Sequence, residues 1–230
     1  RALEEIARDN SPDTPVLRLE DVSMVDNGVT GEESLRDRYG VSGVLLLYVG
    51  NLESYQGIDL LLEAYSRVQG SADDRLLIIG GIPQDIEHYQ QVSEKLGIDD
   101  RVVFCGPRPM NQLGFYLSQA DILLSPRTQG NNTPMKIYSY LGSGKAVLAT
   151  RLPTHTQVLD DAVACLVEPE PGAMAQGLEL LCRDDTLRRQ LGTQGKALVA
   201  REFSLDAFRG KLSGFYRQIA ERVRSARPTE

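Results

Sequence analysis

Short apolar runs alternate with segments of helical periodicity through most of the chain. A continuous apolar run is typical of a strand that is buried on both faces of a parallel sheet. The runs of this kind are residues 44–49, 76–79, 102–105, 122–124, 146–149 and 162–167. The helical segments between them are residues 58–68, 86–96, 112–118 and 134–141. This alternation predicts an α/β fold with a doubly wound parallel sheet of about six strands.

The two ends of the chain are predicted to be mostly helical. The helices expected there are residues 1–9, 32–39, 172–182, 185–202 and 204–225. Gly40 would end the second of these helices as a C-cap, and Ser204 would cap the start of the last one. A short strand is predicted at residues 15–20.

Composition and charge narrow the class of protein. Hydrophobic residues make up 41% of the 230 residues, which is adequate for a core. The formal net charge is −7 and no basic cluster is present, so nucleic acid is not an expected partner. Three cysteines without metal-ligand spacing and two histidines predict core thiols in a reducing compartment and no metal site. No apolar stretch approaches the roughly 20 residues of a membrane span. We therefore expect a cytoplasmic protein and, because the chain starts at Arg1, a fragment of a longer one.

Glycine and polar residues follow the predicted strands, at the edge of the sheet where ligands bind in this kind of fold. The residues that follow a strand are Gly50, Asn51, Gln56, Gly57, Gly80, Gly81, Pro83, Gly106, Pro107, Arg108, Ser125, Arg127, Gln129, Gly130 and Thr150. Glycine permits tight turns and close approach of backbone to ligand, although it is also ordinary turn chemistry. The recurrence of glycine after successive strands indicates a nucleotide cleft.

Residues 127–150 are the most informative segment, because a polar loop, a short helix and a buried strand follow one another there. The loop exposes backbone N–H groups where the helix begins, which suits an anion. Lys136 could meet a phosphate or be a surface lysine, and Arg127 could reach the same anion or be a rim charge. Asn131 and Asn132 could bond hydroxyls or phosphate, or tolerate a left-handed turn. His155 is expected to be a loop histidine.

Other nucleotide and nucleophile motifs are absent from the sequence. There is no Gly-x-x-x-x-Gly-Lys-Ser/Thr, no Gly-x-Gly-x-x-Gly after the first strand and no Gly-x-Ser-x-Gly. Carboxylate pairs at residues 73–74, 99–100, 160–161 and 184–185 are expected to be solvated turns. General acid–base groups need a cleft that tunes their pKa, so none of these pairs is a catalytic candidate.

From about Gly43 to Ser213 the chain resembles the C-terminal, donor-binding domain of group-1 retaining glycosyltransferases with the GT-B fold. The segments that carry the resemblance are Tyr-Val-Gly-Asn-Leu-Glu-Ser-Tyr-Gln-Gly-Ile from Tyr48, Leu-Leu-Ile-Ile-Gly-Gly from Leu76, Arg-Val-Val-Phe-Cys-Gly from Arg101, Ala-Asp-Ile-Leu-Leu-Ser-Pro from Ala120, and the loop, helix and strand of residues 127–150. The resemblance implies a Rossmann-like fold and a nucleotide-sugar donor.

The resemblance also implies roles for single positions. In the family, a basic pair after the first strand binds the donor diphosphate, and the matching positions here hold Asn51 and Gln56. The family's helix carries two glutamates, one facing the sugar and one binding ribose, and the matching positions hold Asn131 and Ser139. Four polar anchors of the family's site are thus neutral in this chain.

Two further parts of the family's site have counterparts in this sequence. Residues 133–136 match the stretch whose backbone amides face the diphosphate, and Pro107 and Arg108 lie where the nucleobase is recognised. The expected donor-binding residues are therefore Gly50, Asn51, Gln56, Gly57, Pro107, Arg108, Arg127, Asn131, Thr133, Pro134, Met135, Lys136 and Ser139. Asn131 and Lys136 are the candidates for a catalytic role.

On this resemblance, residues 1–30 are the remnant of a preceding acceptor domain and linker, residues 31–203 bind the donor, and residues 204–230 form a helix that crosses back to the preceding domain. The implied reaction moves a hexose-type sugar from an NDP-sugar to a hydroxyl acceptor, without a metal or another cofactor. The missing acceptor domain is the expected partner, so the chain alone would be inactive. The resemblance also allows peripheral membrane contact through the full-length enzyme.

Two other functions fit the same residues. The neutral substitutions favour a degenerate domain that binds a nucleotide sugar weakly, or not at all, and serves as a scaffold or regulatory partner. A nucleotide-sugar epimerase of the same architecture is the third hypothesis, and it would need a carboxylate acid–base group in the cleft.

Overall fold

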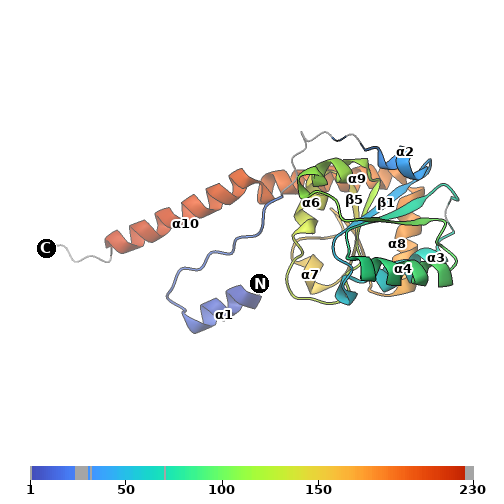
Figure 1. Cartoon of the computed structure of the whole chain (residues 1–230). Helices are drawn as coiled ribbons and strands as arrows, with labels where there is room; N and C mark the ends of the chain where they lie inside the picture. Colours follow the sequence, from blue (N-terminus) through green and yellow to red (C-terminus); the bar gives the residue numbers. More distant parts are fainter. Residues whose placement is uncertain (1, 24–30, 32, 70, 226–230) are drawn as a thin grey trace.

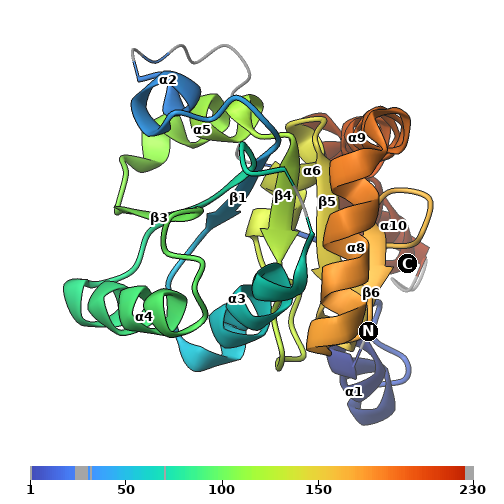
Figure 2. The ribbon, with the colours of Figure 1, turned by 90° about the vertical axis from the view of Figure 1, so that its right-hand side faces the viewer.

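A computed structural model of the chain describes residues 2–23, 31, 33–69 and 71–225, and it contains a six-stranded sheet. The strands are β1 (Leu45–Val49), β2 (Arg75–Ile79), β3 (Val102–Gly106), β4 (Ile122–Ser125), β5 (Ala146–Thr150) and β6 (Cys165–Val167). All of the pairings are parallel, and the spatial order is β3-β2-β1-β4-β5-β6 (Figure 2). The fold predicted from the sequence is confirmed, and strand order reverses between β1 and β4.

Helices cover both faces of this sheet. The helices of the sheet domain are α2 (Leu35–Tyr39), α3 (Ile58–Arg67), α4 (Pro83–Lys95), α5 (Leu113–Gln119), α6 (Lys136–Gly142), α7 (Pro153–Thr156), α8 (Pro171–Arg183) and α9 (Asp185–Leu198). One core joins α3, α4 and α8 to the sheet, and α3 lies beside α8 in Figure 2. A second core joins α2, α5 and α6 to the opposite face. Leu46 and Tyr48 of β1 enter the first core, while Leu45 and Leu47 enter the second, as the two-residue period of a strand requires.

Two carboxylates hold the amino-terminal ends of the central strands. Asp74 accepts a hydrogen bond from the backbone N–H of Val44 at 2.7 Å, and Asp121 accepts one from the N–H of Leu45 at 2.8 Å. Asp121 is also paired with Arg36 of α2 at 2.5 Å. These bonds fix the start of β1 against the two strands that flank it.

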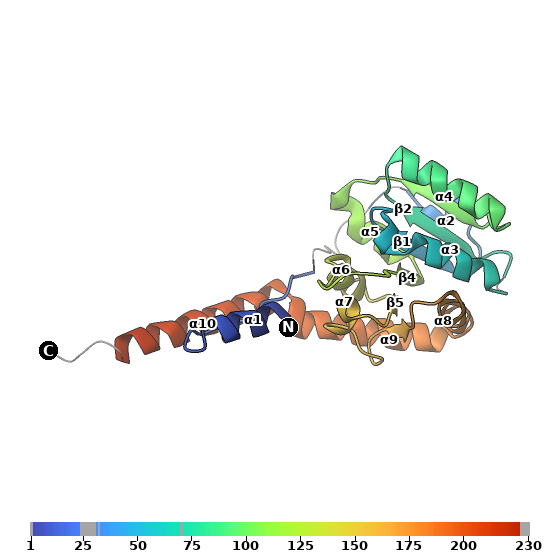
Figure 3. The same ribbon diagram turned by 90° about the horizontal axis from the view of Figure 1, so that it is seen from below.

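The first and last helices lie away from the sheet. Helix α10 (Leu205–Ser225) projects from the sheet domain, and α1 (Ala2–Asn10) with the segment after it runs along its outer part (Figures 1 and 3). A shallow cavity lined by residues of both segments, including Arg8, Pro12 and Phe215, lies between them. None of the α10 residues is buried. The crossing of this helix to a preceding domain stays a prediction, and part of the predicted linker lies outside the described residues.

Some predicted elements differ from the structure. Residues 15–20 are extended but form no strand, because no neighbouring strand pairs with them. The predicted helix at residues 185–202 divides into α9 and a π-helical segment, Val199–Phe203. The short helix α7 was not predicted. Ser204 does cap α10, since its Oγ accepts from the N–H of Ala207 at 3.1 Å.

Two glycines allow loops at the carboxyl edge of the sheet to touch. Gly57 has φ +78°, and a Cβ there would lie 2.0 Å from the carbonyl oxygen of Pro126. Gly80 has φ +114°, and a Cβ there would lie 2.1 Å from the carbonyl oxygen of Gly50. A side chain at either position would therefore separate the loops that follow β1, β2 and β4. Across the described ranges, no helix is both long and apolar enough to cross a membrane.

Candidate functional site

Lys136 is the first residue of α6, and it faces the end of β1. Its Nζ lies 4.1 Å from the centre of the Tyr48 ring and 3.2 Å from Oε1 of Gln56, to which it donates a hydrogen bond. The side chain is half-buried. Burial, together with the nearby guanidinium of Arg127, lowers the pKa of the Lys136 ammonium to about 7. Lys136 is therefore not the ordinary surface lysine that the sequence left open.

Arg127 follows β4 and is only 8% exposed, so it is not a rim charge. Its Nη1 donates to the carbonyl oxygen of Asn132 at 3.1 Å and to Oγ1 of Thr154 at 3.0 Å. The guanidinium lies over the ring of Tyr55, 4.9 Å from its centre. Its Nε is buried and has no hydrogen-bond partner among the described residues.

Lys136 and Arg127 form a pair of cations without a protein anion. Throughout the described part of the chain, no carboxylate forms an ion pair with either residue. An unpaired charge away from water is costly, and an N–H without a partner is costly as well. A bound anion would remove both costs, so this arrangement suits phosphate.

The turn after β1 is held by Tyr48. The Tyr48 hydroxyl donates to the carbonyl oxygen of Asn51 at 2.6 Å, and burial raises the pKa of this phenol. The Asn51 side chain is exposed and donates to Glu53 at 3.2 Å. Gln56 is 7% exposed and accepts from Lys136. The positions of the family's basic pair thus carry neutral side chains, and Lys136 places a cation beside the second of them.

The predicted residues of the α6 loop divide between surface and core. Asn131, Asn132 and Met135 are exposed, and Thr133 is half-buried. Ser139 is 4% exposed, so its short hydroxyl lies within the packing of α6. No described residue other than glycine has a positive φ, which excludes a left-handed turn as the reason for the two asparagines.

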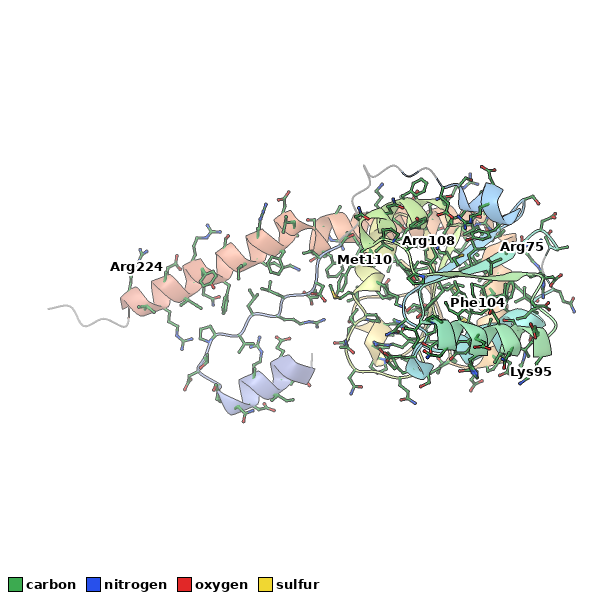
Figure 4. The ribbon with its side chains drawn as sticks, viewed as in Figure 1. Arg75, Lys95, Phe104, Arg108, Met110 and Arg224 are labelled. Atoms are coloured by element: carbon green, nitrogen blue, oxygen red, sulfur yellow. The ribbon has the colours of Figure 1, made fainter. Side chains whose placement is uncertain are left out.

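The Arg108 side chain donates hydrogen bonds to other residues of the sheet domain. Its Nη1 donates to the carbonyl oxygen of Cys105 at 2.6 Å, and its Nη2 donates to the hydroxyl of Tyr39 at 3.1 Å. Its Nη2 also lies 3.5 Å from Glu33. Arg108 and the exposed Met110 lie near each other in Figure 4 and border a small apolar cavity of about 20 Å³ beside the ends of β1 and β2. The predicted base-binding position is therefore next to a cavity. Both Nη atoms of the guanidinium are bonded, while its Nε, like that of Arg127, is buried without a hydrogen-bond partner among the described residues.

His155 is not the loop histidine expected from the sequence, because it is fully buried in α7. Its Nδ1 lies 2.8 Å from the carbonyl oxygen of Thr150, which can only accept, so Nδ1 carries the proton. Its Nε2 then accepts from Oγ of Ser125 at 2.8 Å. Burial lowers the pKa of His155 to about 4, so the imidazole is neutral. Nothing in the local sequence indicated this burial except Pro153, which starts the helix.

A polar cavity of about 510 Å³ lies at the opposite, amino-terminal edge of the sheet, and its lining includes Arg36, Asp74, Asp121 and Arg188. These residues are engaged by protein groups, because Asp121 pairs with Arg36 and Arg188 pairs with Asp185. Asp74 accepts from the backbone N–H of Val44. The cavity therefore offers no unpaired charge comparable to Lys136 and Arg127.

The sequence model of the family described as "Glycosyl transferases group 1" matches residues 39–198. The chain belongs to this family. D-inositol 3-phosphate glycosyltransferase of Corynebacterium diphtheriae is 30% identical over 76% of this chain and 43% of its own length. Alpha-D-kanosaminyltransferase of Streptomyces kanamyceticus is 23% identical over 80% of this chain and 48% of its own length. This group 1 chain therefore spans less than half the length of these curated relatives.

Several solved structures share the fold. A crystal structure of HepE from Anabaena in complex with UDP superposes with a TM-score of 0.68 at 20% identity, covering 83% of this chain and 51% of that one. The C-terminal domain of a group 1 family protein from Francisella tularensis superposes with a TM-score of 0.65 at 22% identity, covering 79% of this chain and 99% of that domain. The sheet domain of this group 1 chain therefore has the fold of such a C-terminal domain.

Proposed function

We propose that the chain binds the nucleoside diphosphate part of a sugar donor at the carboxyl edge of its sheet. The observation that carries the proposal is the pair of cations, Lys136 and Arg127, that lie together without a carboxylate among the described residues. The HepE structure, which shares the fold, contains UDP, and this supports a nucleotide as the ligand. In this proposal Lys136 replaces the lysine that the family has at the position of Gln56, and it supplies the positive charge for the diphosphate.

The donor site serves a two-domain glycosyltransferase. The reaction moves a hexose-type sugar from an NDP-sugar to a hydroxyl acceptor with retention of configuration, on the cytoplasmic side of the membrane. Cations and amides stabilise the departing diphosphate, so no metal is needed. The acceptor is bound by a preceding domain, so the chain alone binds the donor but does not transfer the sugar.

Calorimetric titration with UDP, GDP and ADP, each with and without a sugar, tests this function. One nucleotide should bind to the wild type, and Lys136→Met should weaken it by about 10- to 150-fold, the loss of one charged hydrogen bond. Lys95→Met is the matched control, because Lys95 is exposed at the end of α4 on a distant part of the domain (Figure 4). Binding that is equally strong in Lys136→Met would refute the role of this cation.

A non-catalytic scaffold is the second candidate function. The observation that favours it is the neutral set of side chains at the family's charged positions, where Asn51 bonds to Glu53 and Ser139 is buried. A scaffold would give no heat of binding in calorimetric titration with UDP, GDP or ADP at millimolar concentration. It would also show none after the preceding domain of the full-length protein is restored.

A further inference from the structure

The segment from Thr150 to Gln157 holds the loop after β4 by the carbonyl groups of that loop. Thr150 donates through Oγ1 to the carbonyl oxygen of Arg127 at 2.5 Å. Thr154 donates through Oγ1 to the carbonyl oxygen of Asn132 at 2.5 Å, and Gln157 donates through Nε2 to that of Asn131 at 2.9 Å. The carbonyl groups of Asn131 and Asn132 therefore face α7 and the residue that follows it, and the carbonyl of Arg127 faces the end of β5.

Thr154 is the centre of this contact. Its hydroxyl donates to the Asn132 carbonyl and accepts from Nη1 of Arg127, while Nη1 also bonds to the same carbonyl. The side chain of Thr154 is fully buried. One hydroxyl thus fixes both the loop backbone and the guanidinium that is offered to an anion.

The direction of the carbonyls decides the direction of the amides. The described peptide bonds are trans, so each N–H points opposite to the C=O of its own peptide group. Because the carbonyls of Asn131 and Asn132 face α7, the amides of Asn132 and Thr133 face away from it. Neither amide donates to another of the residues that the structure describes. Two free N–H groups in succession suit an anion.

The start of α7 is itself anchored to two strands. His155, next to Thr154, accepts from Ser125 at the end of β4 and donates to the carbonyl of Thr150 at the end of β5. Both bonds are buried, and the neutral imidazole satisfies both with one tautomer. Thr154 is therefore presented from a rigid base.

We propose that Thr154 is a positioning residue, which orients the 127–133 loop and Arg127 for the donor diphosphate. The inference rests on the proposed function, because the anion is the diphosphate of that site. Thr154 touches no donor atom itself, and it acts through Arg127 and the carbonyl of Asn132.

Three variants of the full chain test the role of Thr154. Thr154→Val keeps the shape and removes the hydroxyl, Thr154→Ser keeps the hydroxyl, and Thr156→Val makes the same change at an exposed position of the same helix. Affinity for UDP, GDP, ADP and inorganic pyrophosphate is measured by calorimetry. Solvent exchange of the buried Arg127 Nε–H is measured by ¹⁵N NMR without ligand.

The expected result is a loss of about fivefold to tenfold in affinity for the bound nucleotide and for pyrophosphate in Thr154→Val. Thr154→Ser should stay within about twofold of the wild type, Thr156→Val should be unchanged, and Arg127 Nε–H should exchange faster in Thr154→Val alone. Wild-type affinity in Thr154→Val, or an equal loss in Thr154→Ser, overturns the proposal.

Failure of the proposed function is distinguishable from failure of this inference. If the wild type binds none of the four ligands, the proposal that this chain alone binds the donor is refuted, and Arg127 exchange still decides the role of Thr154. Unchanged exchange in Thr154→Val then overturns the positioning role, and faster exchange supports it. If Thr154→Val does not fold, Thr154→Ala removes the same hydroxyl in a smaller side chain, and unchanged affinity in that variant overturns the proposal.

Discussion

Replacing Lys136 by Met should change the pH dependence of stability in a defined direction. The ammonium faces the Tyr48 ring, Gln56 and Arg127, and its positive charge also acts on His155. Its pKa is about 7 in the fold and about 10.4 in an unfolded chain. Between these values the unfolded chain binds a proton that the native protein does not bind. The free energy of unfolding of the wild type should therefore rise with pH in this window.

The size of the effect follows from the shift. One pKa unit corresponds to about 1.4 kcal/mol, so the contribution of Lys136 to the free energy of unfolding should increase by about 3 kcal/mol between about pH 6.5 and 9.5. Lys136→Met lacks this contribution. The free energy of unfolding of Lys136→Met minus that of the wild type should therefore fall by the same amount between these pH values. The ring of Tyr48 and the amide of Gln56 favour the charged form, so about 3 kcal/mol is an upper bound.

Urea unfolding of wild type and Lys136→Met at four pH values across this window measures the difference. Other titrating groups cancel in the comparison. A Lys136→Met difference that stays constant within about 0.5 kcal/mol would show that the ammonium remains charged in the fold, which would refute the reasoning. Saturating nucleotide should also flatten the curve, because a bound phosphate pairs with the ammonium.

Three further predictions concern the fold around the site. Gly57→Ala should cost about 3 kcal/mol or more in chemical denaturation, because the new Cβ meets the carbonyl of Pro126, whereas Gly97→Ala, with φ +66° and open space, should cost about 1 kcal/mol. The pKa of His155 is about 4 in the fold, below its unfolded value, so wild type should lose up to about 3 kcal/mol of stability as pH falls from about 6.5 to 4. His155→Gln should not lose this stability between about pH 6.5 and 4. A free energy of unfolding that falls with pH as steeply in His155→Gln as in the wild type would contradict the prediction. Ser204→Ala should cost about 1 kcal/mol by removing the cap of α10, with faster hydrogen exchange confined to its first turn, and uniform exchange would argue against it.

The sheet could be predicted from the sequence because its strands are buried on both faces. Each strand is then a continuous apolar run, and the glycines and prolines that follow mark its end. Residues 15–20 contain three apolar residues that suggested a short strand, but pairing needs a neighbouring strand that the local sequence does not show. Helix α7 has four residues, too few to show a helical period.

The candidate site was predicted in outline and not in its contacts. The glycine-rich loops follow from strand ends, and the structure brings Gly50, Gly57 and Gly80 into contact with neighbouring loops. The burial of Arg127 could not be predicted, because one of its partners is Thr154, 27 residues further along the chain. Charged side chains are usually exposed, and only the packed fold shows an exception.

The carboxylates at the start of β1 help to determine which way that strand faces. Leu45, Leu46 and Leu47 are identical and fully buried, so a shift of the strand by one residue would exchange leucine for leucine at one position in each core. Among these four core positions the leucines distinguish such registers poorly, and Tyr48 is the side chain that a shift would move out of the first core. The shift would, however, move the backbone N–H of Leu45 away from Asp121 and that of Val44 away from Asp74. Two hydrogen bonds at the far edge of the sheet therefore act together with the packing of Tyr48 to place its ring beneath Lys136.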